Sequence, residues 1–207
     1  MDRLAPAVSI THWGNMGEDY PQVELNIEYS DDETRQAVLH MLSSSALELA
    51  VKQTLRQAGI AQPVTVSLLI TDDETIHSLN KQYRQQDKPT DVLSFPLLDT
   101  PLVKAPAEQL WLPPEDDSQH EVPSKSPVFV TPPELPTNLG DIVISWPTVL
   151  RQAAGSNTNP AYELLYLLSH GTLHLAGYDD QSEAGYQAMV HLQQSVLQAL
   201  GQKASPA

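Results

Sequence analysis

Two histidines and an aspartate near the end of the chain have the types and the spacing of metal ligands. His170 and His174 lie four residues apart in an apolar stretch, LLYLLSHGTLHLAGYDD, that predicts a buried helix. This spacing places both rings on one helix face, close enough to bind a single ion. Gly177 predicts the end of the helix, and the turn after it brings Asp179 and Asp180 toward the imidazoles. Three protein ligands leave one coordination position open, which is typical of a catalytic metal site.

A purely structural role is the alternative for this histidine pair, because histidines four residues apart also occur in helices that bind no metal. The surroundings favour a metal, since a buried helix tolerates polar side chains only where they are paired or bound. Gly171 stands where the His-Glu-x-x-His pattern of zinc peptidases has its glutamate base. A peptidase of that kind is therefore disfavoured.

The strings HGTLHLAGYDD and QSEAGYQAM resemble the signature of the YbeY family of metal-dependent endoribonucleases and ribosomal RNA maturation factors. That family has a third histidine at the place where this chain has Asp180. The resemblance implies a metal site made by His170, His174 and Asp180, with Asp179 as the alternative third ligand. Zn²⁺ is the expected ion, and the carboxylate makes Mn²⁺ or Mg²⁺ more plausible than three imidazoles would.

A second stretch, YR followed by DKPTDVLSFP, resembles the same family. The resemblance implies that Arg84 is the arginine associated with catalysis, because a planar guanidinium can bind two phosphate oxygens and stabilise charge on phosphorus. By position alone, Arg84 would be an exposed cation at a helix end. Asp91 and Ser94 either help to position RNA or tie down the turn that follows Lys88.

The order of the predicted elements indicates an α+β domain, and the family resemblance implies a small mixed sheet of about four strands packed with helices. Its metal site would lie on a buried helix and the following turn. Strands are predicted at residues 23–29, 64–70, 92–97 and 139–146. Helices are predicted at residues 33–58, as one helix or as two separated at three serines, at 71–83, from 159 through the metal ligands, and at 182–200. Pro96 predicts an edge strand, Gly140 suits a close backbone approach, and Asp141 either serves the site or caps its strand.

The net charge of −15 over 207 residues argues against a general affinity for nucleic acid. Five of the eleven cations nevertheless gather in two neighbouring helices and one loop, namely Lys52, Arg56, Lys81, Arg84 and Lys88. If these side chains converge beside the site, they form a basic patch that can bind RNA. If they do not, they are cations on solvated helix faces.

The chain has no cysteine, which excludes disulfides, a thiolate zinc site and a cysteine nucleophile. It has no apolar run of transmembrane length and no apolar core of a signal peptide near its N-terminus. We therefore expect a soluble cytoplasmic protein that has no membrane partner.

One catalytic domain is expected over residues 1–207, with its core at about 23–200 and a loose leader at 1–20. Residues 98–138 hold nine of the seventeen prolines and an acidic run, so they are expected to form a flexible insert without regular structure. We assign this insert no chemistry, and a regulatory, docking or autoinhibitory role is a weak alternative. The remaining histidines singled out as surface or helix-packing residues are His77, His120 and His191.

The resemblance implies a single-strand-specific, metal-dependent endoribonuclease that matures the 3′ end of 16S ribosomal RNA and takes part in ribosome quality control. Its partners would be ribosomal RNA and the small ribosomal subunit, and no DNA partner is expected. Two other functions also fit these residues: a non-catalytic ribosome assembly factor braced by its metal, and a metallohydrolase of another substrate. The residues identify no general base, and both water and the ribose 2′-hydroxyl remain candidate nucleophiles.

Overall fold

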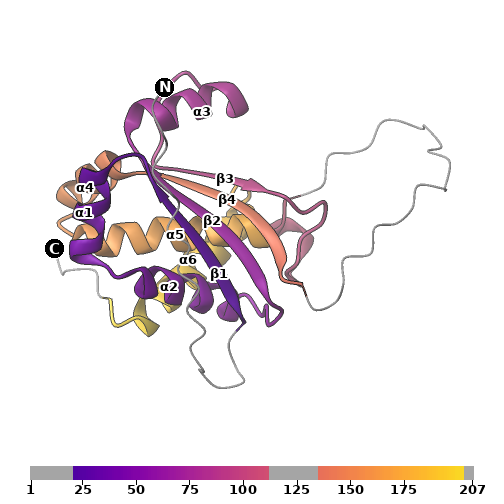
Figure 1. The fold of residues 1–207 in the computed structure, drawn as a ribbon. Coiled ribbons are helices and arrows are strands. Elements are labelled where there is room, and N and C mark those ends of the chain that lie inside the picture. Colours follow the sequence, from indigo (N-terminus) through magenta and orange to yellow (C-terminus); the bar gives the residue numbers. More distant parts are fainter. Residues whose placement is uncertain (1–20, 112–134, 203–207) are drawn as a thin grey trace.

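Four strands form one mixed sheet in the order β1-β2-β4-β3, in a computed structural model that describes residues 21–111 and 135–202 (Figure 1). The strands are β1 (Val23–Tyr29), β2 (Val64–Thr71), β3 (Val92–Pro96) and β4 (Thr137–Ser145). The first, second and fourth strands are parallel, and β3 runs antiparallel to β4 at the edge of the sheet. The predicted mixed sheet and the edge position of the strand that contains Pro96 are confirmed.

Helices cover both faces of this sheet. They are α1 (Asp32–Met41), α2 (Ser44–Gln57), α3 (Asp73–Arg84), α4 (Trp146–Gly155), α5 (Pro160–Ala176) and α6 (Glu183–Ala199), with one 3₁₀ turn, η1 (Ala107–Gln109). In Figure 1, α2, α5 and α6 lie on one face of the sheet and α3 lies on the other. No helix in the described part of the chain is long and apolar enough to cross a bilayer.

Side-chain caps decide where several helices begin. The predicted segment 33–58 consists of two helices, because Ser43 starts a new one by accepting a hydrogen bond from the backbone N–H of Ala46 at 3.2 Å. Asn159 caps the ligand-bearing α5 in the same way, and Pro160 occupies its first turn as predicted. Helix α4 is absent from the predicted elements, although Ser145 with a proline two residues later is a recognisable start signal.

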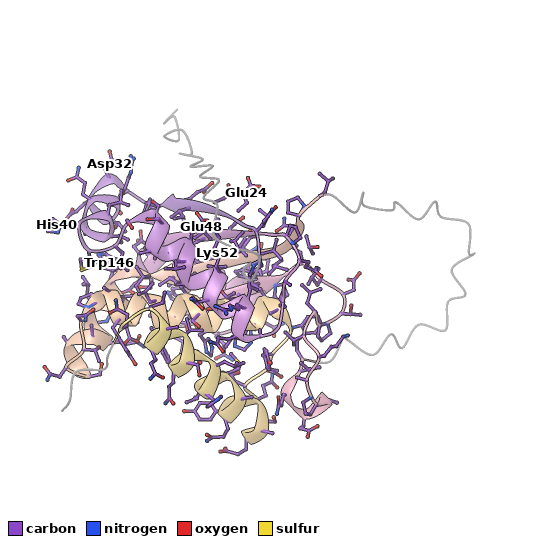
Figure 2. All side chains as sticks on the ribbon, turned by 90° about the horizontal axis from the view of Figure 1, so that it is seen from below. Glu24, Asp32, His40, Glu48, Lys52 and Trp146 are labelled. Carbon is purple, nitrogen blue, oxygen red and sulfur yellow. The ribbon has the colours of Figure 1, made fainter. Side chains whose placement is uncertain are left out.

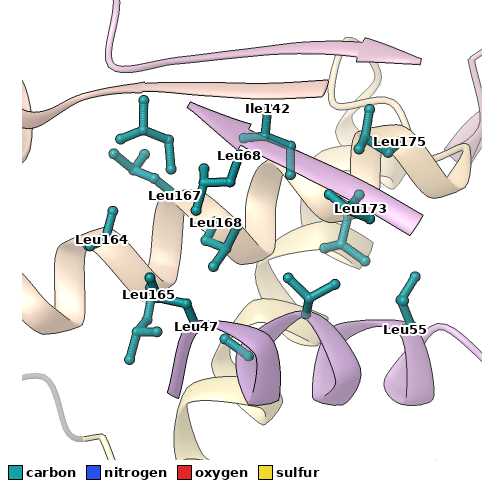
Figure 3. Close-up of a cluster of buried hydrophobic side chains, with 14 of the residues drawn as sticks. Leu47, Leu55, Leu68, Ile142, Leu164, Leu165, Leu167, Leu168, Leu173 and Leu175 are labelled. Carbon is teal, nitrogen blue, oxygen red and sulfur yellow. The ribbon is translucent and has the colours of Figure 1, made fainter. Parts of the chain in front are cut away.

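The core lies between α5, the sheet and α2, as the apolar pattern of α5 predicts (Figure 3). Leu164, Leu165, Leu168 and Leu173 are each at most 2% exposed. They pack among buried side chains of β2, β4 and α2, which include Leu68, Ile142, Leu47 and Leu55. Each buried leucine contributes about 1.5–3 kcal/mol to folding, so α5 is held from two sides and presents its polar residues on a rigid support.

Residues 98–111 belong to the predicted insert, and most of them are neither helix nor strand. This segment includes η1, buries Val103 to 6% exposure, and forms backbone hydrogen bonds to the C-terminal end of α5. Its prolines prevent regular helix and strand, but they do not prevent a fixed path along a neighbouring element. At the other end of the predicted insert, β4 begins at Thr137, two residues before the predicted strand. Residues 112–134, His120 and the predicted leader 1–20 lie outside the described residues.

Candidate metal centre

His170, His174 and Asp180 bring three potential ligand atoms together at the end of α5. The two imidazole Nε2 atoms are 3.0 Å apart, and the Asp180 carboxylate oxygens lie 3.8 Å from His170 Nε2 and 3.9 Å from His174 Nε2. Ligand atoms bound at about 2.1 Å to a tetrahedral ion are about 3.4 Å from one another. The three side chains therefore fit a single ion, and they are the one such group of His, Asp or Glu residues within the described ranges.

The second nitrogen of His174 is held by the backbone. Its Nδ1 lies 2.9 Å from the carbonyl oxygen of Tyr178, which can only accept, so Nδ1 carries the proton and Nε2 presents its lone pair to the other two ligands. Burial, reinforced by the neighbouring His170, lowers the pKa of His174 below its usual range, although the Asp180 carboxylate opposes this effect. A neutral imidazole is the form that binds a metal.

The two aspartates after the helix have different surroundings. Asp180 points its carboxylate at the histidine pair and is 39% exposed at the side chain. Asp179 instead turns its carboxylate to the backbone N–H of Gln181 at 3.3 Å, and its own N–H donates to the carbonyl of Gln109. Of the two candidates for third ligand, the structure places Asp180 with the histidines.

Gly171 allows the ligand-bearing helix to lie directly against the sheet. A Cβ atom at this position would come 2.9 Å from Cγ2 of Ile142 and 3.1 Å from Oγ of Ser94. Both neighbours are buried, so a larger side chain would push α5 away from β3 and β4. The glutamate of a zinc peptidase therefore has no room here.

Arg84 lies in the same pocket as the three candidate ligands. This pocket has a volume of about 520 Å³ and is also lined by Lys88. The guanidinium is positioned by an Nη2 hydrogen bond to the carbonyl of Ser94 at 3.3 Å, and Gln85 ends α3 in the left-handed conformation, with φ of 58°. The sequence places Arg84 and His170 more than eighty residues apart, and the fold brings them to one cavity.

Asp91 ties down the turn, which is one of the two roles predicted for it. Its carboxylate accepts hydrogen bonds from the N–H of Val92 at 2.8 Å, from Oγ1 of Thr90 at 3.1 Å and from Nε2 of Gln152 at 2.9 Å. Ser94 is 5% exposed, and its carbonyl holds Arg84. Both residues thus support the pocket wall from inside the fold.

Asp141 fulfils neither of the roles predicted for it. It lies in the middle of β4 opposite Phe95, on the sheet face beside α3, where it lines a separate pocket of about 480 Å³. Gly140 does serve a close approach, because its φ is 122° and a Cβ there would collide with the carbonyl oxygen of Phe95.

The five cations do not converge into one basic patch. Helix α2 lies on the face of the sheet opposite α3, and Figure 2 shows Lys52 beside Glu48 on α2, where the two form an ion pair at 2.5 Å. Lys81 is paired with Asp87 at 2.8 Å. Arg84 and Lys88 are the members of the five that line the pocket of the candidate ligands.

His77 and His191 do not line this pocket, as predicted. Nε2 of His77 on α3 lies 2.8 Å from the carboxylate of Asp87, which follows the end of that helix, and His191 is exposed on α6. The structure contains two contacts to His174 that the sequence did not predict. They are the carbonyl of Tyr178 on His174 Nδ1, and the indole N–H of Trp111, which donates to the carbonyl of His174 at 3.1 Å. Trp111 belongs to the segment to which the sequence assigned no chemistry.

Fold and site together define an α+β protein in which one buried helix and the turn after it present three candidate metal ligands to an open pocket that also contains an arginine. The family model described as "Endoribonuclease YbeY" matches residues 23–201. Proteins of that name from Roseiflexus castenholzii and Shouchella clausii are each 39% identical to this chain, over 165 and 164 residues. The alignments cover 78% and 77% of this chain and 86% and 89% of the relatives.

The chain therefore belongs to the YbeY family, which confirms the resemblance seen in its two motifs. A solution structure of a Thermotoga maritima protein superimposes with a TM-score of 0.48 at 24% identity, covering 85% of this chain and 88% of that one.

Proposed function

We propose that this protein is a metal-dependent endoribonuclease that cleaves single-stranded RNA. Its family supplies the class of reaction, the hydrolysis of internal phosphodiester bonds in RNA. The observation that carries the proposal is the meeting of His170, His174 and Asp180 with Arg84 in one open pocket. This arrangement joins a candidate cation site to a side chain that recognises phosphate.

Each residue of the pocket has a proposed task. His170, His174 and Asp180 hold the ion, which when bound would polarise a phosphate oxygen or activate water. Arg84 binds the phosphate group and stabilises the charge that develops on it in the transition state. A guanidinium has five N–H donors, so its hydrogen bond to the Ser94 carbonyl leaves donors for phosphate oxygens.

Zinc is the ion that we propose for the site. Two imidazole nitrogens and one carboxylate oxygen form a donor set typical of catalytic zinc, and the lowered pKa of His174 keeps that ligand neutral. The single carboxylate leaves Mn²⁺ and Mg²⁺ as the alternatives to be measured.

The finer proposals rest on the family. We propose that the substrate is ribosomal RNA, that the cleavage matures the 3′ end of 16S ribosomal RNA, and that the protein acts on the small ribosomal subunit and in ribosome quality control. Action on ribosomes implies a location in the cytoplasm.

The test measures bound metal and RNA cleavage together in the native chain and in point variants. His170→Ala and Asp180→Ala should lose both metal and cleavage, while Asp180→His should keep both, because an imidazole can replace the carboxylate. Arg84→Ala should retain its metal and lose about 10²-fold or more in cleavage rate. His191→Ala, which changes an exposed histidine on α6, is the matched control and should behave as the native chain does.

Two outcomes would contradict the proposal. Full metal content and activity in Asp180→Ala would remove Asp180 from the ligand set. A native chain that binds metal and cuts no single-stranded RNA, ribosomal or synthetic, would exclude the nuclease and favour a non-catalytic role.

A further inference from the structure

The segment from Pro101 to Trp111, here termed the strap, runs along the C-terminal end of the ligand-bearing helix. The N–H groups of Leu102 and Val103 both donate to the carbonyl of Ala176, at 2.9 and 3.3 Å. Farther along, the N–H of Trp111 donates to the carbonyl of Gly177 at 3.1 Å. The strap thereby binds carbonyls that the end of a helix leaves without partners.

The strap also contacts both ends of the turn that carries Asp180, defined here as residues 177–182. In the middle of the turn, the N–H of Asp179 donates to the carbonyl of Gln109 at 3.0 Å. At its far end, the hydroxyl of Ser182 donates to the carbonyl of Glu108. At its near end the fit is so close that a Cβ on Gly177 would lie 2.5 Å from Cβ of Pro101. Asp180 is thus flanked on both sides by residues bonded to the strap.

The strap interacts with His174 in two ways, directly through Trp111 and indirectly through Leu110. The indole N–H of Trp111 donates to the backbone carbonyl of His174 at 3.1 Å. Leu110 forms an isolated antiparallel bridge with Tyr178, whose carbonyl accepts the Nδ1–H of His174 at 2.9 Å. The N–H of Asp179, which the carbonyl of Gln109 binds, belongs to the same peptide group as the Tyr178 carbonyl. The strap therefore fixes the peptide group whose carbonyl determines which imidazole nitrogen faces the other two ligands.

We propose that the strap positions Asp180 and His174 for metal binding, with Trp111 as a positioning residue. The inference rests on the proposed function, because it concerns the same three ligands. The side chain of Asp180 is 39% exposed and directs its carboxylate at His170 and His174, so its approach to them depends on the path of the turn. The strap provides that path through backbone hydrogen bonds, which form whatever side chains its residues carry.

A purely structural role for Trp111 makes a different prediction. If Trp111 only covers the core, its loss should lower the free energy of unfolding and leave the metal affinity of the folded chain unchanged. Trp111 is half-buried, and Trp111→Phe keeps most of the ring while removing the donor to His174. The substitution therefore separates positioning from packing.

The experiment uses the full chain and titrates it with Zn²⁺, and with Co²⁺ as a spectroscopic probe, under conditions in which every variant is folded. Trp111→Phe should bind both ions about tenfold more weakly, the lower end of the range for residues that support metal ligands. Its cobalt spectrum should change, and the amide hydrogen of Asp179 should exchange faster. Trp146→Phe, at a buried tryptophan on α4, is the matched control and should lower stability with affinity kept within about twofold.

The outcomes separate this inference from the proposed function. A native chain that binds neither ion would overturn the metal site, and the strap proposal with it. A native chain that binds both ions, together with Trp111→Phe affinities within about twofold of native, would overturn the strap proposal alone. An equal loss of affinity in Trp146→Phe would show that general destabilisation, not positioning, weakens binding.

Discussion

A single glycine sets the distance between the ligand-bearing helix and the sheet. Gly171 lies between His170 and the second ligand, on the face of α5 that meets β3 and β4. Because Gly171 has no side chain, Ile142 and Ser94 can pack close to its backbone. An added Cβ would lie 2.9 Å from Cγ2 of Ile142 and 3.1 Å from Oγ of Ser94. Gly171, which stands where a zinc peptidase has its glutamate base, thus also allows α5 to pack closely on the sheet.

We expect Gly171→Ala to destabilise the fold by about 1–3 kcal/mol, because the added methyl group meets the buried and inflexible Ile142. Urea unfolding at neutral pH measures the change. Gly155→Ala on α4 is the control, since nothing lies within 4 Å of its Cβ position and alanine favours helix by up to about 1 kcal/mol. Equal stabilities of the two variants would show that the close approach at position 171 is unimportant.

At the scale of elements, α3 carries Arg84 and needs its own anchor. Its first residue, Asp73, accepts two hydrogen bonds from Arg151 on α4, at 2.7 and 3.1 Å, and one each from the hydroxyls of Ser145 and Thr148. The hydrogen bonds from Arg151 are the main cause that lowers the pKa of Asp73 to about 2, and the two hydroxyls add to the effect. These hydrogen bonds fix the start of α3 to the end of β4 and to α4.

Arg151→Ala should lower the free energy of unfolding at pH 7 only slightly, because both partners are partly exposed to solvent. A carboxylate with a lowered pKa stabilises the folded state above its ordinary value near 3.8, and that stabilisation is lost as the pH falls through about 2. The difference between native and variant should therefore shrink over this acid range in thermal unfolding. In an Asp73→Asn background the same substitution should cost little. If Arg151→Ala lowered the free energy of unfolding as much in the Asp73→Asn background as in the native chain, Arg151 would stabilise the fold through a partner other than Asp73.

At the scale of the whole molecule, the net charge and the topology both limit where RNA can bind. The net charge of −15 repels RNA, and the placement of α2 and α3 on opposite faces divides the cations that the sequence groups together. Arg84 and Lys88 line the candidate site, whereas Lys52 is paired with Glu48 on the far face. Of the five grouped cations, the two that line the pocket are therefore the ones placed to attract a phosphate group to the candidate ligands.

The dependence of RNA affinity on salt tests this division. With metal removed by a chelator to prevent cleavage, Arg84→Ala and Lys88→Ala should each weaken the binding of a short single-stranded RNA. Each should also reduce the slope of log affinity against log salt by about 0.7–1. Lys52→Ala is the matched control and should leave the slope unchanged. A reduction in Lys52→Ala as large as in Lys88→Ala would show that RNA reaches the α2 face as well.

The sequence by itself determined the features that neighbouring residues encode. The spacing of His170 and His174, the apolar faces of α5 and the capping residue Asn159 all act over one or two helical turns, and the structure contains them as predicted. The family, too, followed from two contiguous strings, and the mixed sheet followed from the family.

Only the tertiary structure decided which distant segments meet. It turned Asp180 and not Asp179 toward the histidine pair, brought Arg84 but not Lys52 into their pocket, and laid the proline-containing strap against α5. Periodicity reports which face of an element is apolar, but not which element covers that face. That choice depends on how elements far apart in the chain pack together.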